Sequence, residues 1–410
     1  MSGIILRKTI KAAGQKILAV HKKIEGEIPD FSGWKDKKVV VVWSTISYNF
    51  RHKRPQEWAD RLAADGYLVI YIENEFLTVE REKKLPPFRI EAKKKNLWLL
   101  TLGSDWNYFI YTQTPTDLSS RVIKKSWEHF LTATNLKLDS NEVTHLVQQP
   151  FWMNFTWLGE NERSTLIGEC FDWHKGFALK AKKLDQLEER MALKANKVVV
   201  SAHFLRAWMR EKGVEPNKIF TITNGVNYEN FASLNFKKNE GKIIGYCGAI
   251  EEWMDGKIIA SLAQKYPHQE IRLIGKNNNP LISKLAKRYA NIKLRGEISF
   301  MRVPEEINKF DVCLIPFEMN KLTEATSPVK FFEYLALGKP VVSTNLRELQ
   351  TYQKVCYLAK SRDDFISQVD KALNEEKYDK IDQLQNMRKA IAKENSWTNK
   401  FTQLKKIIEQ

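Results

Sequence analysis

A short stretch near the carboxyl terminus combines residue types that suit the binding of a phosphorylated ligand. It reads "SPVKFFEYLALGKPVVST", residues 327–344. Ser327 and Pro328 are typical of the start of a helix, because serine accepts a bond from a free backbone N–H and proline has no N–H to lose. Gly338 and Pro340 are typical of its end, and a β-branched run follows. The stretch therefore predicts a helix that leads into a buried strand.

The start of this helix would attract an anion. Its first N–H groups are unpaired and the helix dipole is positive there, which suits a phosphate. Lys330 adds a full positive charge, and Glu333 offers a carboxylate to the hydroxyls of a ribose. The spacing predicts a nucleotide-binding helix. A surface helix with a solvated Lys330 and Glu333 is the alternative that the pattern alone leaves open.

Apolar runs alternate with helical stretches along the rest of the chain, which indicates parallel sheets covered on both faces. The chain has 410 residues, of which 43% are hydrophobic, enough for two domains of ordinary size. Strands are predicted at 37–43, 67–74, 96–102, 143–149, 164–171, 197–202 and 219–226, and in a second series at 242–250, 270–276, 291–298, 311–317, 340–344 and 355–359. We expect an α/β protein with two doubly wound, Rossmann-like domains that face a cleft.

Changes in composition divide the chain into four predicted parts. Residues 227–241 lose periodicity and gain polar residues, so a boundary is placed there. We expect a basic amphipathic helix over 1–28, a first domain over 29–230, a second domain over 231–390, and a final amphipathic helix over 391–410 that could pack back on the first domain.

Ligands of doubly wound sheets bind at the carboxyl ends of the strands, which selects candidate residues. In the second domain these are Gly248, Ala249, Ile250 and Lys276, together with the helix that begins near Ser327.

The same rule selects four residues of the first domain. Asp172 and His174, two residues apart after a strand, form a candidate acid and base pair for proton transfer. Tyr48 could stack on the ring of an acceptor sugar, and Arg54 could bind an acceptor anion. Two alternatives stay open, because His174 could instead pack locally beside Trp173, and Arg54 could stay solvated.

The formal net charge of +17 points to an acidic partner. Residues 4–24 place apolar side chains at steps of three and four, with lysines and arginines around them. Such a helix can lie on an anionic membrane surface, where each cation contributes about 1 kcal/mol. Packing against its own domain or against a second copy is the alternative. Nucleic acid is not expected as a partner, because no RNP-like or Gly-rich aromatic motif is present.

The sequence shows no apolar run of about 18 residues and no secretory leader, so we expect a cytoplasmic protein, peripheral on the inner face of the membrane. Its four cysteines are scattered without a C-x-x-C pair, which predicts buried, reduced thiols. No metal site is expected, and no cofactor.

Four segments together resemble a known family. They read "FRHKRPQEWADRLAADGYLVIYIEN", "TITNGVNYENF", "YCGAIEEWMDGK" and "KFFEYLALGKPVVST". In this order they are similar to the retaining GT-B glycosyltransferases of the glycogen-synthase-like family four, in the branch of bacterial cell-surface polysaccharide and teichuronic-acid enzymes. The resemblance covers residues 37–405.

The resemblance implies a donor, a nucleotide diphosphate sugar, held mainly by the second domain, and an acceptor held mainly by the first. It implies transfer with retention and without a metal, since cationic side chains and a helix start can neutralise a departing diphosphate. Carried over to this sequence, it assigns Glu333 to the ribose, and Ser327, Pro328 and Lys330 to the diphosphate.

The remaining assignments by resemblance concern the donor sugar. Gly248 to Ile250 would lie near the phosphates or the sugar, and Lys276 would add a second positive charge. The family places an acidic residue eight positions before the ribose glutamate. Here that position is Ala325, and Glu324 is the candidate for the role.

The resemblance thus implies a glycosyltransferase that moves a sugar, from a UDP-type donor by default, to a cell-surface glycan or a lipid-linked acceptor. Two alternatives remain. One is a nucleotide-sugar epimerase of the same fold. The other is a non-catalytic scaffold that binds glycan or membrane, which the departure from the family pattern at Ala325 would favour.

Overall fold

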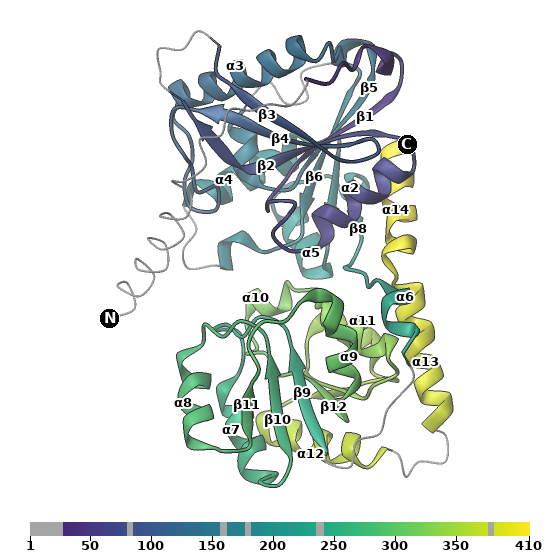
Figure 1. Cartoon of the computed structure of the whole chain (residues 1–410). Helices are drawn as coiled ribbons and strands as arrows, with labels where there is room; N and C mark the ends of the chain where they lie inside the picture. Colours follow the sequence, from purple (N-terminus) through teal and green to yellow (C-terminus); the bar gives the residue numbers. More distant parts are fainter. Residues whose placement is uncertain (1–27, 80–84, 156–161, 177–181, 235–241, 376–380) are drawn as a thin grey trace.

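The computed structural model describes residues 28–79, 85–155, 162–176, 182–234, 242–375 and 381–410. The basic segment expected to form a helix over residues 4–24 lies outside the described residues. Within them the chain forms two α/β units, drawn one above the other in Figure 1, and each is built on its own sheet.

The first unit contains an eight-stranded sheet in the order β3-β4-β2-β1-β5-β6-β7-β8. Its strands are β1 Lys38–Trp43, β2 Leu68–Thr78, β3 Phe88–Lys94, β4 Leu97–Ser104, β5 Glu142–Val147, β6 Ser164–Cys170, β7 Lys197–Val200 and β8 Ile219–Thr221. Its helices are α2 Arg54–Ala64, α3 Asp117–Ala133, α4 Lys182–Lys194 and α5 His203–Glu211.

Strand β1 shows why helices cover both faces of this sheet. Val39, Val41 and Trp43 pack in one apolar cluster with side chains of α3, α4 and α5. Val40 and Val42 point to the opposite face and pack with α2 and with α14, Trp397–Glu409. Successive side chains of a strand alternate between faces, so a run of valines requires two apolar layers.

The edge strand β3 departs from the expected parallel arrangement. It pairs with β4 in antiparallel direction, whereas the other paired strands of both sheets are parallel. The sequence did not predict it, because "FRIEAKK" alternates apolar with charged residues and only Phe88 is buried. A half-exposed edge strand lacks the continuous apolar run by which the buried strands are recognised.

The second unit contains a six-stranded parallel sheet in the order β11-β10-β9-β12-β13-β14. Its strands are β9 Ile243–Cys247, β10 Glu270–Ile274, β11 Ile292–Leu294, β12 Val312–Ile315, β13 Val341–Thr344 and β14 Tyr357–Ala359. Its helices are α6 Tyr228–Ala232, α7 Gly256–Lys265, α8 Pro280–Arg288, α9 Val303–Asn308, α10 Lys321–Glu324, α11 Val329–Ala336, α12 Arg362–Leu373 and α13 Ile381–Glu394.

The chain crosses between the units twice, at adjacent places. The first crossing follows β8, and the second joins α13 to α14, which runs back along the first unit in Figure 1. The N–H of Val226 donates to the carbonyl of Asn395 at 3.1 Å, and the N–H of Trp397 donates to the carbonyl of Val226 at 3.0 Å. The boundary predicted at 230/231 falls inside α6, whose Phe231 is buried in the core of the second unit.

Helix α14 is held on the first unit by a buried aromatic contact. The ring of Trp397 meets that of Trp58 at a centroid distance of 5.2 Å, nearly at right angles. Lys405 pairs with Asp65 at 2.8 Å. In the described part of the chain, no helix is both long enough and apolar enough to cross a bilayer.

Candidate functional site

The strand order of each sheet reverses at one point, and the loops at that point are where ligands of such sheets bind. In the first sheet the reversal lies between β1 and β5, and in the second between β9 and β12. The loop after β9 carries Gly248, Ala249 and Ile250, and the chain after β12 leads to α11. The predicted donor residues of these two segments therefore lie at the switch point of the second sheet, whereas Lys276 follows the neighbouring strand β10.

Helix α11 begins at Val329, with Pro328 as the residue before its first turn. The prediction that Ser327 caps it is wrong. The hydroxyl of Ser327 instead accepts the N–H of Asn224, in the first crossing, at 3.1 Å. No side chain caps the helix, so its first N–H groups have no side-chain acceptor. Ser327 thus joins the helix start to the first unit.

Lys330 and Glu333 lie one turn apart on this helix, and both are only partly buried. Neither forms an ion pair or a hydrogen bond with another described residue, although the ammonium of Lys330 lies 5.2 Å from the ring of Tyr246 and 4.9 Å from that of Phe317. Burial lowers the pKa of Lys330 to about 8. Burial also raises the pKa of Glu333, against the opposing effect of Lys330. Two charged groups at a switch point that have no ionic partner in the described part of the chain are available to a ligand.

Gly248 brings the loop after β9 against Lys330. Its φ is +147°, and a Cβ there would lie 2.9 Å from the Cε of Lys330. The hydroxyl of Tyr246 donates to the carbonyl of Ala249 at 2.7 Å, and the N–H of Ile250 donates to the carbonyl of Lys276 at 3.0 Å. The backbone of this loop is thus fixed, while the side chain of Lys276 is exposed.

Glu324 is the last residue of α10 and is partly buried. Ala325, the position where the resemblance expects an acid, is 1% exposed and packs in an apolar cluster of the first unit. A carboxylate at this position would lose its hydration among apolar side chains, which is costly. The packing of α10 against the first unit is a physical reason for the alanine.

The structure separates the predicted acid and base pair. Asp172 is exposed, and its charge raises the pKa of Tyr111, after the greater effect of burial. His174 is buried, and its Nδ1 lies 2.7 Å from Oε1 of Glu188, itself fully buried. The imidazole of His174 is therefore packed locally. Gly176, just after it, lies beside Leu322 of α10, so this loop borders the second unit.

Tyr48 is not the exposed stacking platform that the sequence suggested. The residue is 7% exposed, its ring packs edge-on against Tyr71 at 5.3 Å, and its hydroxyl donates to Asp60. Its aromatic face is covered because the loop after β1 folds back over β2. An acceptor sugar would need to displace this packing.

Arg54 is buried rather than solvated or open to an acceptor. Its Nε donates to Oε1 of Glu169 at 2.6 Å. Its Nη1 lies 3.3 Å from both the carbonyl of Thr223 and Oδ1 of Asn224. The guanidinium therefore connects β6 to the first crossing of the chain.

Sequence reasoning missed the contacts that hold the two units together at this place. Nη2 of Arg51 pairs with Oε1 of Glu297, in the second unit, at 2.6 Å. Nδ2 of Asn224 donates to the carbonyl of Ser327 at 2.8 Å. The run "RHKR" at 51–54 was the available signal, but nothing in it names a partner some 170 to 250 residues away.

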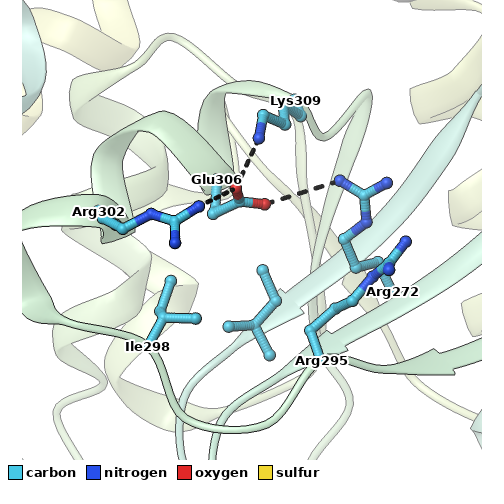
Figure 2. Close-up of a pocket in the computed structure, with 7 residues that line it drawn as sticks. Arg272, Arg295, Ile298, Arg302, Glu306 and Lys309 are labelled. Atoms are coloured by element: carbon cyan, nitrogen blue, oxygen red, sulfur yellow. Dashed lines mark hydrogen bonds and ion pairs between the residues drawn. The ribbon is translucent and has the colours of Figure 1, made fainter.

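A separate hollow of about 440 Å³ lies in the second unit, between β10, β11 and α9 (Figure 2). It is lined by Arg272, Ile274, Arg295, Ile298, Arg302, Glu306 and Lys309. Oε1 of Glu306 lies 2.5 Å from Nζ of Lys309 and 3.6 Å from Nη2 of Arg302. Its Oε2 lies 3.8 Å from Nη1 of Arg272. These cations are paired with a carboxylate inside the hollow, unlike Lys330.

Comparisons with known proteins find similarity in sequence over part of the chain and in fold over most of it. Residues 241–375 match the family described as "Glycosyl transferases group 1". A stretch of 258 residues is 27% identical to TuaH of Bacillus subtilis (strain 168), assigned as a teichuronic acid biosynthesis glycosyltransferase, and spans 60% of this chain and 62% of that relative.

Solved structures show the same fold. A sucrose-phosphate synthase from Thermosynechococcus elongatus has a TM-score of 0.68 at 12% identity, over 91% of this chain and 98% of that one. Anabaena HepE, in complex with UDP and glucose, has a TM-score of 0.60 at 13% identity, over 91% and 99%. The predicted GT-B fold is confirmed. The chain thus has the GT-B fold, and residues 241–375 in its second unit match the group 1 glycosyl transferases.

Proposed function

We propose that the protein is a glycosyltransferase that moves a sugar from a nucleotide diphosphate sugar to a cell-surface glycan or lipid-linked acceptor. One observation carries the proposal. Lys330 and Glu333, on the helix that starts at the switch point of the second sheet, are partly buried and have no ionic partner among the described residues. The matched family, the relative TuaH, and the UDP in the HepE structure support the choice of ligand.

The chemistry follows from these groups. Glu333 would accept hydrogen bonds from the ribose hydroxyls, and Lys330 with the N–H groups of α11 would stabilise the departing diphosphate. The bond between the anomeric carbon and the phosphate oxygen breaks while the acceptor oxygen bonds to that carbon. The acceptor proton passes to the leaving phosphate oxygen on the same face, so the configuration is retained. In this scheme the cationic groups of the protein do the work that a divalent metal does elsewhere.

The first unit would hold the acceptor. Its exposed Asp172 lies in the loop beside α10, and Glu324 ends α10. These two carboxylates are the candidates for contact with the acceptor and the transferred sugar. His174 would act by supporting this loop through Glu188.

The first test is thermal denaturation of the protein with UDP, GDP, TDP, CMP and their sugar conjugates, beside the variant Glu333→Ala. We expect one nucleotide family to raise the melting temperature, and the variant to lose at least about tenfold in affinity, since hydrogen bonds to a charged group contribute about 1.5–3 kcal/mol. Glu305→Ala, at an exposed position of α9, is the matched control and should bind normally.

The outcomes separate the alternatives. Unchanged nucleotide affinity in Glu333→Ala would show that the ribose assignment is wrong. Binding without turnover in the presence of acceptors would favour a non-catalytic scaffold. A nucleotide-sugar epimerase is not favoured by the matched family, and it would convert the donor without an acceptor to a product that still carries the nucleotide.

The proposed place of work is the inner face of the membrane, reached through the basic segment 4–24. Its cations and the net charge of +17 are the support. Removal of residues 1–26 should reduce sedimentation with vesicles that contain phosphatidylglycerol, while nucleotide binding stays unchanged. Vesicles of pure phosphatidylcholine are the control. Equal sedimentation of both forms with anionic vesicles would contradict the assignment.

A further inference from the structure

The loop between β1 and α2 ends in three basic residues, Arg51, His52 and Lys53, here called the basic loop, and a fourth, Arg54, is the first residue of α2. Lys53 is the residue before the first turn of α2, and its backbone N–H donates to Oε1 of Gln56 at 3.1 Å. Nε2 of the buried Gln56 donates in turn to the carbonyl of Ser47 at 3.1 Å. The backbone at Lys53 is therefore fixed, so its side chain extends from a rigid position.

The residues on both sides of Lys53 are tied to the second unit. Arg51 pairs directly with Glu297 at 2.6 Å. Arg54 binds Asn224, whose backbone N–H and side-chain amide both donate to Ser327, two residues before α11 begins. Lys53 thus lies between two connections that join the units, one from Arg51 to the loop after β11 and one from Arg54 through Asn224 to the start of α11.

Lys53 itself is exposed and forms no ion pair within the described ranges. Its positive charge lowers the pKa of Lys330, in addition to the larger effect of burial, whereas Glu333 raises that pKa. The charge of Lys53 also lowers the pKa of Glu333, against the larger effect of burial. Lys53 therefore lies close enough to α11 to act on both groups. Lys53 therefore adds a second positive charge to the electrostatic surroundings of Lys330 and Glu333. Like charges that approach without a shared counterion repel, and a diphosphate between them would remove this cost.

We propose that Lys53 is a phosphate ligand of the donor site, supplied by the first unit to a nucleotide diphosphate that the second unit holds. The inference rests on the proposed function. Lys330 and the start of α11 would bind the diphosphate from one side, and Lys53 from the other. The donor then bridges the two units, and Arg51 acts as a positioning residue that keeps the basic loop over the diphosphate through Glu297.

The test compares UDP with UMP in calorimetric titrations of the full chain, since UMP lacks the second phosphate. Lys53→Ala should weaken UDP about tenfold and UMP less than twofold, and Lys53→Arg should restore most of the affinity for UDP. The control is Lys125→Ala, at an exposed position of α3. No effect is expected there, because α3 lies at the top of the first unit in Figure 1, away from the second unit. Arg51→Ala should weaken UDP in the same selective way, but less.

Each outcome decides something. Equal loss for UDP and UMP in Lys53→Ala would overturn the inference, because the residue would then act on the fold or on another part of the ligand. Wild-type affinity of Lys53→Ala for UDP would overturn it as well and leave the proposed function standing. A wild-type protein that binds none of UDP, GDP and TDP would overturn the proposed function, and the inference with it. Unchanged melting temperatures of the free variants verify that they fold.

Discussion

At the residue scale, the proposed donor site depends on the protonation of one partly buried lysine. Lys330 lies above two aromatic rings, and burial brings its pKa to about 8. The group is charged at neutral pH and loses its proton as the pH rises through that value. A diphosphate would stabilise the charged form, so binding and protonation are linked.

We therefore expect the affinity for UDP to fall with increasing pH, by up to about tenfold between pH 7 and pH 9, because Lys330 must recover a proton to bind the diphosphate. In Lys330→Gln, affinity should be lower at pH 7 and nearly independent of pH. Calorimetric titration over this range measures both. A flat profile for the wild-type protein, or the same slope in the variant, would show that another group titrates.

Which residues could be predicted at this scale depended on whether their partners lie nearby in the sequence. Lys330 and Glu333 share one helix, so their spacing alone predicts a common face. The burial of Tyr48 and the bond between Arg54 and Glu169 depend on strands that only the folded sheet brings together. The residue types of Tyr48 and Arg54 suggested an acceptor site, but the burial of both side chains contradicts that role.

At the element scale, two tight turns set the position of Lys330. Gly248 follows β9 and Gly275 follows β10, and both have positive φ, +147° and +138°. A Cβ on Gly275 would lie 1.9 Å from the carbonyl oxygen of Gly248. The two neighbouring loops therefore pack backbone against backbone, and the loop after β9 holds its shape against Lys330.

Gly275→Ala should destabilise the second unit, because the new Cβ meets backbone and the φ is strained. The strain alone costs about 1–3 kcal/mol, which corresponds to a fall in melting temperature of several degrees. Nucleotide affinity should also fall, since the displaced Gly248 moves Lys330.

Differential scanning calorimetry with Gly33→Ala as the control checks this expectation. An added Cβ at the exposed Gly33 meets nothing within 4 Å, and its φ is not positive, so stability should change little. Equal melting temperatures of the two variants would contradict the account of the paired turns.

The elements themselves were predicted with uneven success, for a physical reason. The buried parallel strands are continuous apolar runs, and the sequence places them within a few residues of their observed bounds. Strand β3 and the short helix α10 are partly exposed and carry charges, so local pattern does not distinguish them from loops. The packing of helix α10 against the first unit nevertheless gives a physical reason for the alanine at position 325.

At the scale of the whole molecule, the last helix belongs to the unit that the chain left more than 170 residues earlier. Trp397 is 4% exposed and packs in the same cluster as Trp58 of α2. The first unit is therefore completed only when the second has been made and the chain has returned.

Trp397→Ala should lower the free energy of unfolding by about 3–5 kcal/mol, the usual cost of removing a buried tryptophan side chain. The loss should appear in the first unit, because the cavity forms between α14, α2 and β1. Urea unfolding followed by circular dichroism measures it. Gln403→Ala, at an exposed position of the same helix, should change the free energy by no more than about 0.5 kcal/mol. Similar costs for the two variants would mean that α14 does not stabilise the first unit.

The double crossing between the units also determines how they can move. One connecting segment would let two bodies swivel in every direction, as on a ball joint. Here the two segments are bound to each other through Val226, so twisting would break their hydrogen bonds, and bending about a single axis would keep them. The two connecting segments together therefore favour rotation of the units about one axis. A rotation about this axis that brought the units together would carry the basic loop along one path, toward the start of α11.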